Sequence, residues 1–189
     1  MTEVRLFSST SLDGFIADED GDSEWLEAYK PRILAASGFL EKIGAVVMGR
    51  RAFEVIRAFG DWPYEGKAAF VLSSQMLGQA PSDTSIVYDG MGAALQLARE
   101  STNKDVWIVG GALTMQSALE GGFVDIVEVC VLPVLLGTGM SLFTNLNRHE
   151  ELMFDGMEVF PDGIVKLRYM TAVEAKVSGM LAPQFAKPA

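Results

Sequence analysis

The chain has 189 residues, of which 49% are apolar and 21% charged, and its formal net charge is −10. This length suits one domain with a sizeable core, and a mean hydropathy of +0.23 excludes a mainly disordered chain, because enough apolar surface is present to offset the entropy lost on folding. An isoelectric point near 4.5 argues against nucleic acid or an anionic membrane as the main partner, since both attract fields of Lys and Arg.

Membrane, disulfide and zinc chemistry are also disfavoured. The longest apolar stretch, residues 127–140, contains a glutamate, a proline and two glycines, and it is shorter than the roughly 20 residues that a membrane helix needs. A single cysteine, Cys130, cannot form an internal disulfide, and a single histidine, His149, cannot build a Cys/His zinc site. The N-terminus lacks the pattern of a signal peptide, so we expect a reduced, cytoplasmic protein without a metal.

Strand and helix patterns alternate along the chain. The first half predicts a strand at 4–9, an extended piece at 15–17 after an Asp-Gly turn, a helix at 31–43, a strand at 45–48 and a helix that ends at 59. The second half predicts strands at 68–72 and 85–88, a helix at 91–100, a strand at 105–109, a helix at 111–119, a strand at 124–132 and a hairpin within 159–170 that turns at 161–163.

This order predicts an α/β fold of three layers, αβα, with a mostly parallel sheet and an antiparallel edge strand at its C-terminal end. Residues 1–172 are expected to form one domain and residues 173–189 a C-terminal tail.

Three junctions between a predicted strand and the segment after it carry unusual residues, and ligands of open α/β sheets bind at such junctions. In the first, Gly49 precedes Arg50 and Arg51 at a helix start, which suits an anion. The alternative is a solvated helix start whose arginines pair with Glu54 or Asp61, and the motif alone does not decide between the two.

The other two junctions are weaker signals alone. Ser73 and Ser74 end a strand with two hydroxyls, which are also common turn residues. Gly110 and Gly111 separate a buried strand from a helix and allow a diphosphate to approach its N-terminus, although the spacing is not that of the dinucleotide fingerprint. Together, an arginine pair, a hydroxyl pair and a diglycine describe a cleft for a ligand with several phosphates.

Five segments occur in the order seen in the dihydrofolate reductase-like superfamily: 11–17, 48–51, 72–74, 109–111 and 132–139. The closest resemblance is to the branch that contains the C-terminal reductase domain of the bacterial bifunctional riboflavin-biosynthesis deaminase-reductase and its stand-alone relatives. It covers residues 4–171. It implies a dihydrofolate reductase-like fold, NADPH as hydride donor, and a homodimer.

The resemblance also implies which residues contact each part of the cofactor. For the 2′-phosphate and diphosphate these are Gly49, Arg50, Arg51 and the backbone of Ala52. For the adenine ribose they are Leu72, Ser73 and Ser74. For the diphosphate they are Val109, Gly110, Gly111, Ala112, Leu113 and Thr114, with a cis peptide between the glycines. For the nicotinamide they are Ser9, Ile16 and Ala17.

The sequence departs from both kinds of relative on the substrate side. Dihydrofolate reductases carry a substrate-binding acid a few residues after a tryptophan, but that distance from Trp25 reaches Lys30, and Glu27 is the nearest acid. The riboflavin enzymes typically have Lys where Phe15 stands. The substrate therefore stays open between a pterin-like ring and a riboflavin-precursor pyrimidine of the 5-amino-6-(5-phosphoribosylamino)uracil type.

Some residues have two interpretations. Asp13 either stabilises its Asp-Gly turn, which we favour, or is a polar group near the nicotinamide and the first candidate for a catalytic proton donor. Glu128 lies on a solvated face, which we favour, or in the cleft. Four aromatic residues either wall a flat ring or, more commonly, fill the core: Trp25, Phe53, Phe59 and Trp62.

We therefore predict an NADPH-dependent reductase that transfers hydride to a small heterocyclic substrate. The alternative is a non-catalytic NADPH- or ligand-binding protein that lacks the substrate acid. An NADH-dependent enzyme is a third possibility, which the effect of Arg50→Ala on cofactor affinity would test.

Overall fold

The computed structural model describes residues 2–29, 33, 38–143, 146–147 and 149–171. Eight strands form one sheet in the order β5-β4-β3-β6-β1-β7-β10-β9. Their bounds are β1 (Val4–Ser11), β3 (Ile43–Gly49), β4 (Ala68–Leu72), β5 (Thr84–Val87), β6 (Asp105–Gly110), β7 (Ile126–Leu132), β9 (Leu152–Val159) and β10 (Val165–Thr171). A small second sheet pairs β2 (Phe15–Ala17) with β8 (Met140–Ser141).

The six strands from β5 to β7 are parallel, and β10 runs antiparallel to both β7 and β9. The prediction of a mostly parallel sheet with an antiparallel C-terminal edge is therefore confirmed, although the edge is a hairpin of two strands. Its turn lies at Pro161–Gly163, as expected, but β9 begins at Leu152. Because Asp155, Gly156 and Glu158 interrupt its apolar residues, no long apolar run marked β9 in the sequence.

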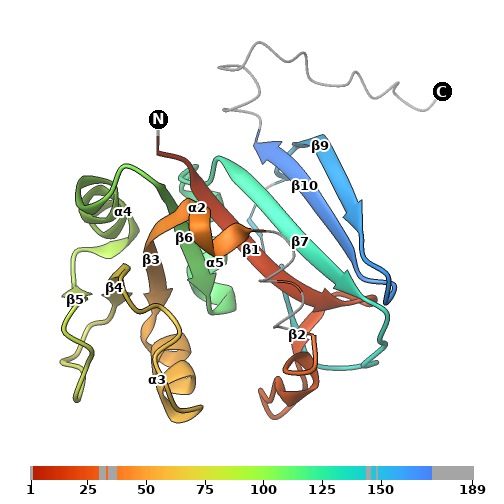
Figure 1. The fold of residues 1–189 in the computed structure, drawn as a ribbon, viewed down its shortest axis with the longest axis horizontal. Coiled ribbons are helices and arrows are strands. Elements are labelled where there is room, and N and C mark those ends of the chain that lie inside the picture. The colour runs from red at the N-terminus through yellow and green to blue at the C-terminus, as the bar shows by residue number, and fades with distance from the viewer. Residues whose placement is uncertain (1, 30–32, 34–37, 144–145, 148, 172–189) are drawn as a thin grey trace.

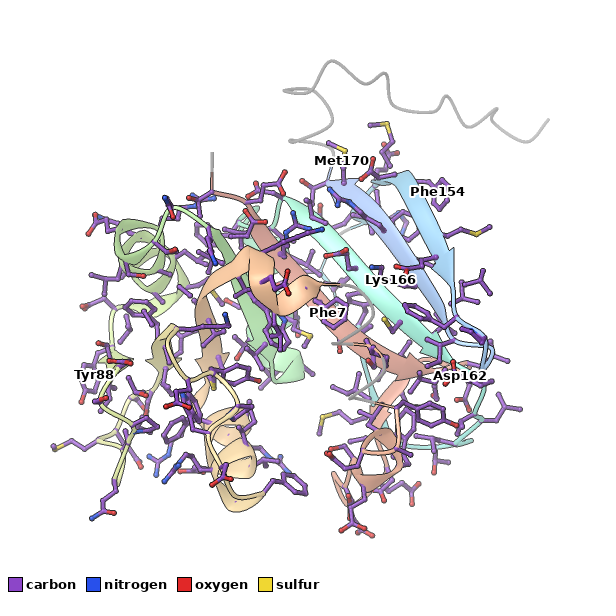
Figure 2. The ribbon with its side chains drawn as sticks, viewed as in Figure 1. Phe7, Tyr88, Phe154, Asp162, Lys166 and Met170 are labelled. Atoms are coloured by element: carbon purple, nitrogen blue, oxygen red, sulfur yellow. The ribbon has the colours of Figure 1, made fainter. Side chains whose placement is uncertain are left out.

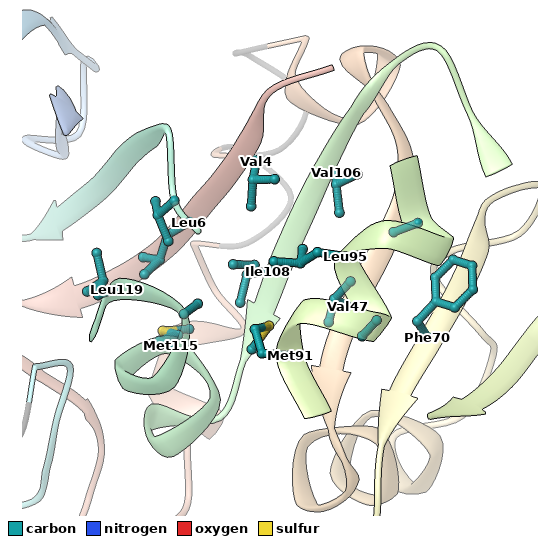
Figure 3. Packing of buried hydrophobic residues seen from close by; sticks show 14 of the residues in the cluster. Val4, Leu6, Val47, Phe70, Met91, Leu95, Val106, Ile108, Met115 and Leu119 are labelled. Atoms are coloured by element: carbon teal, nitrogen blue, oxygen red, sulfur yellow. The ribbon is translucent and has the colours of Figure 1, made fainter. Parts of the chain in front are cut away.

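Helices cover both faces of the sheet, which confirms the three layers (Figure 1). One face packs against α4 (Gly90–Ser101) and α5 (Ala112–Glu120). The other packs against the short helices η1 (Glu24–Leu26) and α2 (Phe39–Lys42) and against α3 (Arg50–Ala58). Figure 3 shows the first of these layers, where Met91 and Leu95 of α4 lie over Val47 and Ile108 of the sheet.

The predicted helix at 31–43 is tested only in part, because residues 31–32 and 34–37 lie outside the described residues. The described end of this segment is α2, and β3 begins at Ile43, two residues earlier than expected. Gly44, which lies between the predicted helix and the predicted strand, belongs to the strand. A Cβ at Gly44 would lie 2.0 Å from Oγ1 of Thr102, so only glycine lets β3 pass this side chain.

One prediction about the sheet is wrong. Glu128 is 4% exposed and not solvated, and it forms an ion pair with Arg5, which is 6% exposed. The Arg5 guanidinium also contacts Asp105 at 2.7 Å and Glu3 at 2.6 Å. Burial lowers the pKa of Arg5, but the hydrogen bond and the negative charge of Asp105, with the other two carboxylates, more than offset burial and raise it.

No helix formed by the described residues is both long and apolar enough to cross a membrane. The predicted tail, residues 173–189, lies outside the described residues, so the predicted division of the chain stays a prediction.

Candidate functional site

A cleft of about 780 Å³ opens at the carboxyl ends of β1, β3 and β6, beside α3. Of the residues that the family resemblance assigns to the cofactor, all line this cleft except Ser73 and Ser74. The cleft thus brings together these residues: Ser9, Ile16, Ala17, Gly49, Arg50, Arg51, Ala52, Leu72, Val109, Gly110, Gly111, Ala112, Leu113 and Thr114. They come from four parts of the chain, 9–17, 49–52, 72 and 109–114, which the fold brings together in one cleft.

Two helix N-termini meet in the cleft. Gly49 is the N-cap of α3, and Gly111 is the N-cap of α5. The first N–H groups of a helix have no partner within the helix, and they carry its partial positive charge. No side chain caps either helix, so these groups of both helices are available to an anion.

The two helices approach closely because Gly49 has no side chain. A Cβ at Gly49 would lie 2.5 Å from Oγ1 of Thr114, which belongs to the first turn of α5. This distance is too short for a real contact, so a larger residue would force the Thr114 side chain or α5 itself to shift. The spacing of the two N-termini therefore depends on this glycine.

The predicted cis peptide between Gly110 and Gly111 is wrong, since no cis peptide bond occurs in the described residues. Gly110 instead turns the chain with a φ of +140°, in a region that residues with a Cβ rarely adopt. A Cβ there would also lie 2.9 Å from Cε of Met115. The turn delivers Gly111 to the start of α5 without a cis bond.

The two arginines at the start of α3 have different surroundings. Nε of Arg50 donates to Oε1 of Glu54, and its Nη1 donates to Oε1 of Gln75, each at 2.6 Å. Arg51 has no ion pair with the described residues, and its guanidinium borders Gly21 across the cleft, in the loop after β2. The alternative interpretation, pairing with Glu54, is therefore correct for Arg50. Arg51 is open to an anion of a ligand.

Ser73 supports this arrangement from outside the cleft. Its hydroxyl donates to the backbone oxygen of Gln75 at 2.6 Å and accepts from the Gln75 N–H at 3.1 Å. Because Gln75 in turn contacts Arg50, Ser73 stabilises the turn that holds the arginine. Neither Ser73 nor Ser74 lines the cleft, so the structure does not bring them to the predicted ribose site.

Asp13 lies in the turn between β1 and β2 and does not line the cleft. Its carboxylate accepts hydrogen bonds from the Ser11 hydroxyl at 2.6 Å and from the backbone N–H groups of Leu136 and Gly137 at 3.2 and 2.7 Å. The Ser11 hydrogen bond, followed by that of Gly137, lowers the pKa of Asp13. These contacts fit the favoured interpretation, a structural role in the turn.

The segment that Asp13 holds has its own link to the cleft. After Gly137 the chain enters β8, which pairs with β2, and Met140 of β8 lines the cleft together with Ile16 and Ala17 of β2. By holding the segment before β8, Asp13 therefore helps to fix where the β2–β8 sheet lies beside the cleft.

The end of the cleft away from the helix N-termini has an aromatic floor. Phe7 of β1, Trp107 of β6 and Tyr64 of the loop after α3 all line it and are buried. Four aliphatic residues surround this floor: Leu26, Ile33, Leu40 and Ile56. Burial raises the pKa of Tyr64, so its hydroxyl stays neutral.

The sequence pointed to other aromatic residues. Of the four candidates, only Phe59 lines the cleft, while Phe53, Trp25 and Trp62 pack in or against the core. Trp107 and Val109 line the cleft two residues apart, as do Phe7 and Ser9, because alternate residues of a strand share a face. Counting two residues back from Ser9 and Val109 along their strands would have identified Phe7 and Trp107 as cleft residues. Tyr64 lies in a loop, where no sequence pattern predicts which way a side chain points.

The rim of this end carries acidic side chains. Glu27, the acid nearest to the expected substrate carboxylate, and Asp61, which follows α3, line the cleft and are exposed. Ser23 adds a hydroxyl. Burial raises the pKa of the Cys130 thiol to about 12, so the thiol stays protonated and is a poor nucleophile. Among the described residues, no group of acidic, His or Cys side chains is suited to bind a metal.

The family model described as RibD C-terminal domain matches residues 2–166. The chain belongs to the RibD C-terminal domain family. This confirms the family that the five sequence segments indicated. Among curated relatives, the chain is 27% identical over 169 residues to the uncharacterized protein YwjB of Bacillus subtilis (strain 168), covering 88% of this chain and 97% of the relative.

Solved structures agree with the RibD C-terminal domain assignment. A putative riboflavin biosynthesis protein from Shewanella sp. PV-4 is similar with a TM-score of 0.75 and 28% identity, over 90% of this chain and 99% of that one. A deaminase/5-amino-6-(5-phosphoribosylamino)uracil reductase from Thermotoga maritima shares the fold, with a TM-score of 0.64 and 15% identity over 90% of this chain and 57% of that one. These two solved structures therefore share the fold of this chain.

Proposed function

We propose that this protein is an NADPH-dependent reductase that transfers hydride to a C=N or C=O carbon of a small planar heterocycle. The observation that carries the proposal is the meeting of two helix N-termini, α3 and α5, with Arg51 at one end of a cleft whose other end is aromatic. The charged end suits the diphosphate and 2′-phosphate of a dinucleotide, and the aromatic end leaves room for a flat ring held beside the nicotinamide.

The residues at the charged end fit the cofactor. N–H groups at the starts of α3 and α5 would hold the diphosphate, and the close approach at Gly49 fixes the distance between the two helices. Arg51 would bind the 2′-phosphate, because a guanidinium fork matches the geometry of phosphate oxygens. Ser9, Ile16 and Ala17 would contact the nicotinamide at the strand end of β1 and in β2.

NADPH supplies the hydride, and the substrate gains that hydride on carbon and a proton on nitrogen or oxygen, leaving NADP⁺. The chain orients the two rings and keeps water away with the apolar side chains around Phe7 and Trp107. Asp13 is ill suited to donate the proton, since it lies outside the cleft lining and its lowered pKa keeps it ionised. We therefore propose that the proton comes from solvent at the rim.

The decisive experiment is a calorimetric titration of the protein with NADPH and, in parallel, with NADH. NADPH should bind at least about tenfold more tightly, because only NADPH carries the phosphate that Arg51 would contact. Failure to bind either nucleotide contradicts the proposal. Tight binding of NADPH, with no oxidation by any pterin or pyrimidine tested, would favour the non-catalytic alternative.

For the assembly we propose a homodimer through β9. This edge strand presents Phe154, Met157 and Val159 on one face with large exposed fractions, and Figure 2 shows Phe154 at the outer side of the sheet. Among the described residues no strand pairs with the outer edge of β9, so a second copy could add its own edge strand across a twofold axis.

A further inference from the structure

We propose that Tyr64 is a catalytic residue whose hydroxyl donates a hydrogen bond to the nitrogen or oxygen of the substrate bond that is reduced. This inference rests on the proposed function, which so far names no group that polarises this bond. Three observations carry it: the unpaired hydroxyl of Tyr64, the rings that hold it, and its place in the cleft.

The hydroxyl of Tyr64 is available to a ligand. Tyr64 is 6% exposed and lines the cleft, yet its hydroxyl forms no hydrogen bond with any described residue. This oxygen is also not among the fully enclosed polar atoms that lack a partner in the described part of the chain, so it keeps access to the space of the cleft. Because a mostly buried hydroxyl without a partner is unfavourable, a hydrogen bond to a ligand atom would be a net gain.

The ring that carries the hydroxyl is held in place by two tryptophans. Trp62 and Trp107 meet it edge to face, with ring centroids 5.1 and 5.5 Å from that of Tyr64. Trp107 is itself fixed, since its indole N–H donates to the backbone oxygen of Phe7 at 3.0 Å. The backbone oxygen of Tyr64 accepts the N–H of Lys67 at 3.0 Å, which closes a turn at this residue. The hydroxyl is therefore positioned before a substrate arrives, as an effective hydrogen-bond donor in catalysis must be.

Tyr64 borders the part of the cleft next to the proposed nicotinamide end. Its neighbour Trp107 precedes Val109 by two residues on β6, and Phe7 precedes Ser9 by two residues on β1. Two residues of a strand span about 7 Å. Because Ser9 is assigned to the nicotinamide, a substrate ring in this space would have the hydride donor on one side and the Tyr64 hydroxyl on the other.

Hydride transfer to a C=N or C=O carbon benefits from such a donor. When the hydride reaches the carbon, the electron pair of the double bond moves to the nitrogen or oxygen, where negative charge develops. The hydrogen bond from Tyr64 stabilises this charge as it forms. Burial raises the pKa of Tyr64, so the hydroxyl keeps its own proton, and solvent protonates the product and leaves NADP⁺.

The first experiment detects the contact itself. The full chain is labelled with ¹³C at the phenolic carbon of tyrosine, so that its four tyrosines give four NMR signals, and the signal missing from Tyr64→Phe belongs to Tyr64. The probes are 7,8-dihydropterin and 5-amino-6-(5-phosphoribosylamino)uracil, each added with and without NADP⁺. At least one probe should shift the Tyr64 signal and leave those of Tyr88 and Tyr169 in place. No shift of the Tyr64 signal with either probe overturns the inference.

The second experiment measures turnover in Tyr64→Phe, which removes the hydroxyl and keeps the ring. For a probe that oxidises NADPH, kcat should fall at least about tenfold and KM should change less than about threefold. NADPH affinity and the urea midpoint should stay unchanged, because the hydroxyl has no partner to lose among the described residues. An unchanged kcat, or a fall in kcat with an equal loss of NADPH affinity, contradicts the catalytic role.

Tyr169→Phe is the matched control. Its ring also has an edge-to-face contact, with Phe154 at 5.8 Å, but Tyr169 lies outside the cleft lining, so this variant should keep the kcat of the parent chain. An equal fall of kcat in both variants would show that the loss does not come from the cleft.

The inference and the proposed function fail in distinguishable ways. If NADPH does not bind, the proposed function fails, and the Tyr64 signal without NADP⁺ still decides whether the hydroxyl contacts a heterocycle. If NADPH binds and Tyr64→Phe keeps full turnover, the reductase proposal stands and only the role of Tyr64 is wrong. A probe that shifts the Tyr64 signal but never oxidises NADPH would make Tyr64 a binding residue and overturn its catalytic role.

Discussion

The carboxylate of Asp13 accepts the backbone N–H of Gly137 at 2.7 Å and so ties the β1–β2 turn to the segment that leads into β8. The two residues are 124 positions apart in the chain. Because β8 pairs with β2, and both strands supply residues to the cleft, a turn carboxylate sets the position of the predicted nicotinamide end.

We predict that Asp13→Ala speeds hydrogen exchange in residues 136–141 and weakens NADPH binding several-fold, because all three acceptor contacts are lost. Asp13→Asn, which keeps one acceptor oxygen, should give a smaller effect. Exchange measured by mass spectrometry, beside the NADPH titration, checks both. A loss of turnover in Asp13→Asn with unchanged exchange would instead indicate that Asp13 is catalytic.

The same contact has a defined pH dependence. The pKa of Asp13 is lowered from 3.8, so the carboxylate is ionised and the contact is complete above that ordinary value. The contact is lost only as the pH falls through the lowered pKa. Between about pH 5 and pH 9, NADPH affinity should therefore show no titration from this group. A step in that range that disappears in Asp13→Asn would contradict the positioning role.

Arg51→Ala should weaken NADPH binding by about tenfold and leave NADH binding nearly unchanged, because a charge-assisted contact to the 2′-phosphate is removed. Arg50→Ala should have a smaller effect, since Arg50 already pairs with Glu54 and Gln75. Arg57→Ala, on the same helix but outside the cleft lining, serves as the charge control. Equal losses for NADPH and NADH in Arg51→Ala would remove the 2′-phosphate assignment.

Gly49→Ala should destabilise the fold by about 1–3 kcal/mol and weaken NADPH binding, because the new methyl group overlaps Oγ1 of Thr114. The double variant with Thr114→Ala removes that oxygen and should recover much of the stability, since the next atom, the Thr114 Cβ, lies 3.8 Å away. Urea unfolding of the single and double variants measures the coupling. Independent, additive losses would mean that the two helices do not meet at Gly49.

Arg5→Ala should cost about 3–5 kcal/mol of unfolding free energy, because it leaves Glu128 buried without its counter-charge. Arg99→Ala is the matched control, since the exposed pair between Arg99 and Asp125 contributes about 0–1 kcal/mol. Urea unfolding provides both values. Similar losses in the two variants would show that the buried cluster contributes no more than a surface pair.

Met157→Lys should convert the proposed homodimer to a monomer, because it places a charge within the apolar face of β9, where Met157 is 66% exposed. Tyr88→Lys, at the opposite edge of the sheet in Figure 2, is the control and should leave the mass unchanged. Light scattering after size-exclusion chromatography gives the mass of each. A monomeric parent chain would overturn the assembly proposal at once.

The parallel strands and most of the cofactor end could be predicted because their signals are local. An apolar run followed by glycine, arginine or diglycine marks a strand end wherever the strand lies in the sheet. Glu128 was misjudged because its partner Arg5 is 123 positions away, and no local pattern carries that pairing. Tyr64 was missed for a similar reason: this loop residue is held in place partly by its contact with Trp107, which is far away in the sequence.

The position of β1 in the centre of the sheet has a consequence for synthesis on the ribosome. Val4 pairs with Val106 in β6, and Arg5 pairs with Ile126 in β7. The first strand therefore finds its neighbours only after more than a hundred further residues have been translated. Until then its apolar face has no partner strand, and the long loop that must close makes this step slow. We expect chains cut before β7 to remain unfolded and bound to chaperones, and the full chain to fold in one late event.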